Sequence, residues 1–155
     1  MRSFRYTIHI DRSPAHVWAF MLDFSKAPLW RNLVREVKIL TDGPIRPGTE
    51  LQITFDVLGR VRTARCEVWA FETARRFGLR NTEENATGTF EYTLAPDGTG
   101  TLVTFTCDIR PHGLMWLLLP LMIRGNRARY AQQLLNLKQE VERAAGQSSD
   151  VVSGL

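Results

Sequence analysis

Three histidines are the first residues to consider for chemistry in this 155-residue sequence, because an imidazole can act as a metal ligand or a general base near neutral pH. His9, His16 and His112 lie far apart, and His9 falls on the polar side of an alternating segment. A metal cluster or a Ser-His-Asp triad needs partner residues, and no pattern in the sequence supplies them. We therefore interpret all three as surface or loop residues, and we expect no metal site.

Other reactive groups give equally little support for catalysis. The nucleotide-binding patterns GxGxxG and GxxxxGK[ST] do not occur, so we expect no cofactor. Glu83 and Glu84 are adjacent, but they resemble the solvated end of a strand more than a paired acid and base. Cys66 and Cys107 stand singly in strand-like segments, and we interpret them as small, buried or half-buried thiols of a reducing compartment.

What remains is a set of aromatic side chains suited to the wall of an apolar ligand pocket. Each ring alone is more simply interpreted as core, but a chain of this size rarely needs so many large rings to fill a core without a void. Tyr92, Tyr130, Arg65 and Asn81 are the candidates for the few polar groups of such a pocket. The predicted ligand-binding residues are Trp30, Phe55, Arg65, Trp69, Asn81, Phe90, Tyr92, Phe105, Trp116 and Tyr130.

Composition places the chain among soluble globular proteins, with a hydrophobic fraction of 44% and a charged fraction of 23%. Its length predicts one domain. The net charge is +4, but the arginines are scattered among Asp and Glu, so we expect no nucleic-acid partner. The N-terminus runs straight into an alternating segment without the apolar core of a signal peptide, and we expect a cytoplasmic protein.

The elements that position these residues begin with a strand and a capped helix. Residues 4–11 alternate between apolar and polar, which is the period of a strand buried on one face. Ser13 and Pro14 then predict a helix start, because serine caps the first free N–H groups and proline needs no partner at the first position. Trp18 and Phe20 belong to the apolar part of that helix.

Further alternating segments predict an antiparallel sheet, and a change to helical periodicity predicts a long helix after it. Residues 62–72 have mixed parity, which indicates a bulge or a strand covered on both faces. Gly146 is expected to end the helix and residues 147–155 to form a disordered tail. The helix carries a stripe suited to lying across a sheet, formed by Tyr130, Leu134, Leu137 and Val141. The other strands are expected near residues 37–39, 51–57, 62–72, 77–83, 88–94 and 103–109.

Several short motifs follow one another in a definite order from residue 4 to about residue 145. They are Ser13-Pro14-Ala15 with Val17-Trp18, Asp23-Phe24, Trp30, Asp42-Gly43-Pro44 with Gly48-Thr49, and Leu137-Lys138 with Val141-Glu142. In this order they resemble the polyketide cyclase/dehydrase and lipid-transport family, in the START-like (SRPBCC) superfamily that also holds the birch-pollen allergens. The resemblance implies an α+β helix-grip fold over residues 1–146. In that fold a curved antiparallel sheet of six to seven strands wraps around a long C-terminal helix, short helices follow the first strand, and a cavity opens between sheet and helix.

The resemblance and the aromatic set together predict that the protein binds a hydrophobic or aromatic small molecule, lipid or polyketide-like, in that cavity. The alternative is a polyketide cyclase, aromatase or dehydratase in which Tyr92, Tyr130 or Arg65 assists proton transfer on the bound chain. This enzymatic alternative rests on the family resemblance alone. A third interpretation is a partner-binding or stress-response module with a vestigial cavity.

The longest apolar run, Leu114–Ile123, has three interpretations. It is too short to cross a bilayer, which needs about 20 apolar residues, so we expect no integral membrane segment. The family resemblance makes it the entrance portion of the long helix, kinked near Pro120 and partly lining the cavity, and we favour this interpretation. If exposed instead, the run would form a homodimer contact or a membrane-docking surface, with Trp116 and the following arginines at the interface.

Overall fold

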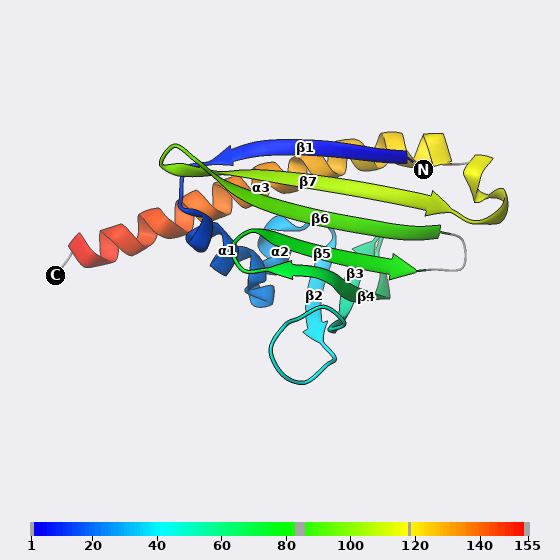
Figure 1. Cartoon of the computed structure of the whole chain (residues 1–155), viewed down its shortest axis with the longest axis horizontal. Helices are drawn as coiled ribbons and strands as arrows, with labels where there is room; N and C mark the ends of the chain where they lie inside the picture. The colour runs from blue at the N-terminus through cyan, green and yellow to red at the C-terminus, as the bar shows by residue number, and fades with distance from the viewer. Residues whose placement is uncertain (1, 83–85, 118, 154–155) are drawn as a thin grey trace.

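A curved antiparallel sheet forms the larger part of the fold (Figure 1). The computed structural model describes residues 2–82, 86–117 and 119–153, and in this part of the chain seven strands lie in the order β1-β7-β6-β5-β4-β3-β2. Every neighbouring pair is antiparallel, which confirms the predicted sheet. The strands are β1 (Arg2–Ile10), β2 (Val34–Ile39), β3 (Glu50–Val57), β4 (Arg60–Glu72), β5 (Arg76–Thr82), β6 (Ala86–Asp97) and β7 (Gly100–Pro111).

The alternation of β1 gives the sheet one apolar face. Tyr6 of β1 lies opposite Phe105 of β7, and Phe4 lies opposite Cys107. Because strand side chains alternate between faces, these four residues share a face. Phe4, Phe105 and Cys107 are buried there, as the period-two pattern predicts.

Short helices link the two edges of the sheet. α1 (Pro14–Leu22), the 3-10 turn η1 (Phe24–Lys26) and α2 (Ala27–Trp30) carry the chain from edge strand β1 to edge strand β2. Ser13 Oγ accepts a hydrogen bond from the backbone N–H of His16 at 3.3 Å, which confirms the predicted cap. The helix α1 buries Val17, Trp18, Phe20 and Met21.

The long helix α3 (Leu119–Ser153) runs along one face of the sheet, and its C-terminal part extends past the sheet edge (Figure 1). Leu134, Leu137 and Val141 are buried, so the predicted stripe does face the sheet. The backbone stays helical to Ser153, so the prediction that Gly146 ends the helix was wrong. A single glycine costs a helix only about 1 kcal/mol, so it ends a helix reliably only together with a change of backbone direction.

The bulge predicted in β4 is present. The register between β4 and β5 shifts between Val68 and Ala70, so Trp69 is the extra residue. Its indole packs over Gly78 so closely that a Cβ added there would lie 2.6 Å from Trp69 Nε1. Glycine is therefore required at this point of β5, and the bulge explains the mixed parity of the strand.

The first part of the apolar run after β7, residues 114–117, does not follow the favoured prediction, whereas the run from Leu119 on begins the long helix as predicted. A 3-10 turn η2 (Gly113–Leu117) precedes α3, and in it Leu114, Trp116 and Leu117 are 80%, 62% and 58% exposed. Gly113 has φ +62°, which redirects the chain at the end of β7. Pro120 lies in the first turn of α3, where its missing N–H needs no partner, and so it marks a start and not a kink. The side chains of Met115, Leu119 and residues 121–123 lie outside the described part of the structure.

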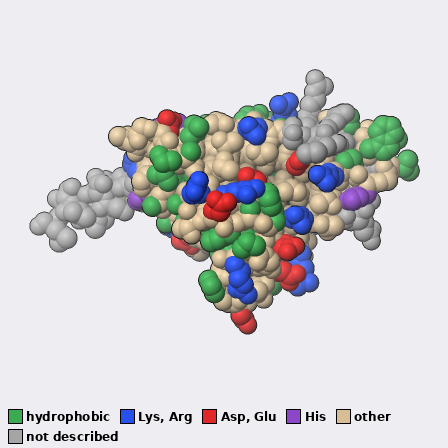
Figure 2. All heavy atoms as spheres, in the orientation of Figure 1, with side chains coloured by type: hydrophobic (Ala, Val, Ile, Leu, Met, Phe, Trp, Pro, Cys, Tyr) green, Lys and Arg blue, Asp and Glu red, His purple; other side chains and the backbone are tan. Residues whose placement is uncertain are grey.

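The surface carries mixed charge. On the face shown in Figure 2, Lys and Arg side chains are interspersed with Asp and Glu, and hydrophobic side chains gather at the end where β7 leads into η2. No helix in the described part of the chain is long and apolar enough to cross a membrane. Glu83 and Glu84, interpreted above as a solvated strand end, lie outside the described residues.

Candidate ligand-binding site

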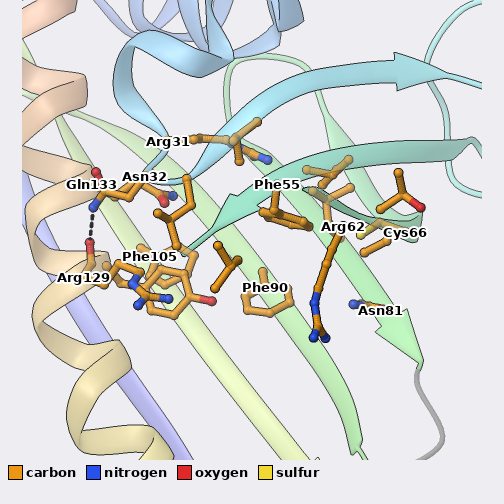
Figure 3. A pocket seen from close by; sticks show the side chains of 18 of the residues that line it. Arg31, Asn32, Phe55, Arg62, Cys66, Asn81, Phe90, Phe105, Arg129 and Gln133 are labelled. Atoms are coloured by element: carbon orange, nitrogen blue, oxygen red, sulfur yellow. Dashed lines mark hydrogen bonds between the residues drawn. The ribbon is translucent and has the colours of Figure 1, made fainter. Parts of the chain in front are cut away.

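A cavity of about 410 Å³ opens between the concave face of the sheet, the segment after α2 and the first half of α3. Its wall comes from β3, β4, β5, β6 and β7, from residues 31–34, and from Arg129, Tyr130 and Gln133 of α3 (Figure 3). Apart from Thr63, each of the strands β3 to β7 contributes side chains of one parity, because that parity points to the concave face. The cavity therefore lies at the place where the helix-grip resemblance implied one.

Aromatic rings form much of this wall. Tyr92 of β6 lies opposite Phe105 of β7, with ring centroids 4.9 Å apart. Tyr130 reaches from α3 onto the same cluster, 4.9 Å from the ring of Phe105 and 6.0 Å from that of Phe90. Such offset and tilted rings give a rigid apolar surface. Of the ten predicted ligand-binding residues, the structure brings six to the wall, namely Phe55, Asn81, Phe90, Tyr92, Phe105 and Tyr130.

The hydroxyl of Tyr92 is held by α3. Gln133 Nε2 donates a hydrogen bond to Tyr92 Oη at 2.7 Å, and both side chains are buried (Figure 3). Burial raises the pKa of Tyr92, chiefly because the phenolate would lose its hydration. Tyr92 is therefore neutral at pH 7, and its O–H can still donate while its oxygen accepts from Gln133.

Tyr130 is neutral for the same reason. Burial raises its pKa, and the nearby groups Cys107 and Tyr92 raise it further. The thiol of Cys107, behind the aromatic wall, has its pKa raised to about 12, first by burial and then by the charge of Asp108. All three groups are protonated at neutral pH, so none of them is poised as a base.

Four predicted ligand-binding residues do not line the cavity. Arg65 lies on the outer face of β4, where its Nη2 is 3.3 Å from Glu50 Oε2. Trp69 is the bulge residue, and the guanidinium of Arg76 lies 4.8 Å from its ring. Trp116 is exposed in η2, and Trp30 is fully buried behind Tyr92, with the two ring centroids 5.9 Å apart.

Six polar side chains of the wall were not predicted from the sequence. They are Arg31, Asn32, Arg62, Thr63, Arg129 and Gln133. Arg62 could have been predicted to line the cavity, because it has the same parity as Cys66 on its strand. In the sheet it lies opposite the wall residue Phe55. Arg31 directly follows Trp30, but the turn after α2 that aims it inward has no simple sequence signature.

The histidines lie apart from the cavity. His9 Nδ1 is 2.9 Å from Asp97 Oδ2, and His112 Nε2 is 2.9 Å from Thr87 Oγ1, both in exposed positions. Within the described residues, no three His, Cys, Asp or Glu side chains are grouped so that they could hold a metal ion.

Comparison with known proteins agrees with this geometry. The family model described as "Polyketide cyclase / dehydrase and lipid transport" matches residues 1–142. A comparison with curated protein sequences found no match.

Solved structures show the same fold at low sequence identity. The Zhui aromatase/cyclase from Streptomyces sp. R1128 has a TM-score of 0.75 and 17% identity, covering 93% of this chain and 95% of that one. A START superfamily protein from Mycobacterium smegmatis has a TM-score of 0.74 and 15% identity, covering 92% and 98%. The protein TTHA0849 from Thermus thermophilus has a TM-score of 0.75 and 17% identity, covering 92% and 99%. At such identities the likeness establishes the helix-grip fold alone.

Proposed function

Because this chain belongs to the polyketide cyclase/dehydrase and lipid transport family, we propose that it binds a hydrophobic or aromatic small molecule in the cavity between the sheet and α3. The observation that carries the proposal is a cavity of about 410 Å³ walled by aromatic rings. Protein interiors are normally packed with few voids larger than a water molecule. A space of this size, mostly apolar with a few polar groups, is the usual form of a small-molecule site.

The cyclase alternative has less support from the same wall. Its ionisable side chains, among the described residues, are arginines, two neutral tyrosines and Cys66, and no carboxylate or imidazole lines the cavity. Proton transfer at neutral pH works best with a group whose pKa lies near 7, and burial moves Tyr92 and Tyr130 away from that value. Arg65, the third candidate, faces away from the cavity. Binding therefore needs fewer additional assumptions than catalysis.

Titration with a neutral environment-sensitive dye such as Nile red tests the proposal. We expect saturable one-to-one binding with a dissociation constant near 1 μM, equivalent to about −8 kcal/mol, which burial of a medium-sized aromatic molecule can supply. The expected change is a blue-shifted emission that a second apolar compound reverses.

A matched pair of substitutions locates the binding. Ala64 lies on the cavity wall, so Ala64→Trp fills the space, whereas Glu67→Trp adds the same ring to the exposed face of the same strand. We expect Ala64→Trp to abolish dye binding and Glu67→Trp to leave it unchanged. Equal binding by the two variants, or no saturable binding by the parent, would contradict the proposed function.

A further inference from the structure

The cavity wall has an unbalanced charge. Three arginines, Arg31, Arg62 and Arg129, line it from three different elements, and among the described lining residues there is no Asp or Glu. The exposed outer face differs, since Arg65 pairs there with Glu50 and Arg76 with Glu91. Within the described residues, the cavity wall therefore presents positive charge without a carboxylate to balance it.

Arg31 is the most confined of the three. Its side chain belongs to a residue only 9% exposed, and no described carboxylate lies within ion-pair distance of it. The guanidinium carbon lies 5.0 Å from the ring of Trp30 and 5.9 Å from that of Tyr92. These cation–π contacts offset part of the desolvation cost, but a buried charge is normally also paired.

One polar group beside Arg31, the hydroxyl of Tyr92, can also donate a hydrogen bond to a ligand. Tyr92 is neutral, and its oxygen already accepts from Gln133, so its O–H remains available. The side chain of Asn32 is engaged elsewhere, because its Nδ2 donates to the carbonyl of Arg129 at 2.9 Å and its Oδ1 accepts from Asn136 at 3.1 Å. A ligand that reaches this corner thus meets a guanidinium and a hydroxyl donor.

We propose that the ligand is an amphipathic carboxylic acid, with its carboxylate on Arg31 and its apolar body against Phe90, Phe105 and Tyr130. This inference rests on the proposed function and narrows its ligand class. A guanidinium matches a carboxylate with two parallel hydrogen bonds. One buried cation balances one negative charge, whereas a doubly charged phosphate would leave charge uncompensated in a poorly hydrated corner. Arg62 and Arg129 are exposed and add a favourable field at the rim.

The test compares ligands that differ only in the head group. The measurement is the displacement of Nile red from the parent protein at pH 7 by decanoate, by decanol and by decyl phosphate. Charge-assisted hydrogen bonds predict that decanoate binds about ten- to a hundredfold tighter than decanol. We also expect the preference to vanish as the pH falls through the ligand's own pKa, because the neutral acid resembles the alcohol.

Two variants assign the preference to Arg31. Arg31→Gln should bring decanoate and decanol to similar affinity, whereas Arg65→Gln, on the outer face of β4, should keep the parent preference. If Arg31→Gln does not fold, Arg62→Gln serves instead, and we expect it to weaken decanoate about two- to fivefold and decanol not at all.

The outcomes separate this inference from the proposed function. No saturable binding of Nile red by the parent would overturn both. Bound Nile red that none of the three ligands displaces would overturn the inference and leave the proposed function standing. Decanol binding as tightly as decanoate would overturn the inference and leave the proposed function standing. Decyl phosphate binding tighter than decanoate would overturn the carboxylate assignment, and a folded Arg31→Gln protein that retains the full preference would overturn the role of Arg31.

Discussion

The two halves of α3 meet the same sheet but leave different interiors. Toward the C-terminal half, which we call the closed end, Leu137 and Val141 are fully buried, as are Ile10 and Val17 of the first two elements. Toward the N-terminal half, the open end, Tyr130 and Gln133 contact Phe105 and Tyr92 of the sheet and line a cavity of about 410 Å³. One helix thus serves as core at one end and as a pocket wall at the other.

The difference follows from the side chains that the helix presents. Aliphatic residues at the closed end interdigitate with the sheet and fill the space, as in an ordinary core. At the open end, a buried amide, a guanidinium and large rings cannot pack as densely, since the polar groups must keep hydrogen-bonding geometry. Substitutions at the closed end are therefore expected to change mainly the stability of the fold, and those at the open end mainly its affinity for a ligand.

Truncation at the closed end should give the largest effect. Leu137→Ala removes a fully buried side chain, and we expect a loss of about 2–5 kcal/mol in the free energy of unfolding, measured by urea denaturation. Phe90→Ala at the open end should cost less, because one side of the Phe90 ring already borders the cavity. The affinity of the Phe90→Ala protein for the dye should fall, while the affinity of the Leu137→Ala protein should not. Equal losses of stability in the two variants would break the proposed distinction.

Removal of the Tyr92 hydroxyl should have a smaller effect. Tyr92→Phe leaves the buried Nε2 of Gln133 without its acceptor, and we expect it to lower stability by about 1–3 kcal/mol. Tyr130→Phe is the control, because no hydrogen bond to the Tyr130 hydroxyl occurs among the described residues, and its stability should remain within about 0.5 kcal/mol of the parent. In thermal unfolding, Tyr92→Phe should melt at a lower temperature than Tyr130→Phe. The reverse order of melting temperatures would mean that the hydrogen bond from Gln133 is unimportant for stability.

Much of the open end was predictable because strand parity assigns faces. The inward positions of Phe55, Phe90, Tyr92 and Phe105 follow from alternation alone, and the structure has them on the cavity wall. Arg62 has the same inward parity, but it was not predicted to line the cavity, because a charged residue on a strand usually indicates the outer face.

The errors have local causes that the sequence pattern does not reveal. A bulge shifts parity by one residue, so Trp69 left the expected face. The positive φ of Gly113 turns the chain outward, and that angle decides whether Trp116 is in the pocket or in solvent. Whether the wall residues contact a ligand stays a prediction, because burial next to a cavity is compatible with core packing as well.

A pH dependence should appear at the closed end. Burial raises the pKa of Glu142, but hydrogen bonds from Lys138 and from the backbone N–H of Asp11 outweigh this, and the net pKa is lowered. A lowered folded-state pKa means that Glu142 stabilises the fold above its unfolded pKa of about 4.3, and that this stabilisation is lost as the pH falls through the folded value.

Urea denaturation at several pH values would measure the contribution of Glu142 to stability. We expect Glu142→Gln to be less stable than the parent at pH 7 and equal to it at pH 3, so that the difference closes between these values. The control is Glu140→Gln, which loses only an ion pair with the exposed Arg143. A gap between Glu142→Gln and parent that does not narrow with acid would show that Glu142 acts by packing and not by charge.

The smallest effect on stability is expected outside the open end, at η2. Leu117 is 58% exposed, so Leu117→Asp should change the free energy of unfolding by less than about 0.5 kcal/mol. Leu134→Asp is the contrasting variant, because Leu134 is buried at 3% exposure and an unpaired charge there should cost several kcal/mol. If both proteins melted at the same reduced temperature, the outward position of η2 would be wrong.

The same Leu117→Asp protein then distinguishes the remaining roles of the exposed residues Leu114, Trp116 and Leu117. If they form a homodimer contact, sedimentation of the parent should depend on concentration and that of the variant should not. If they dock on membranes, the parent should bind anionic lipid vesicles and the variant should bind them more weakly, since exposed apolar side chains followed in the sequence by arginines suit such a surface. Unchanged sedimentation and unchanged vesicle binding would remove both roles and leave η2 as a simple connection between β7 and the wall of the cavity.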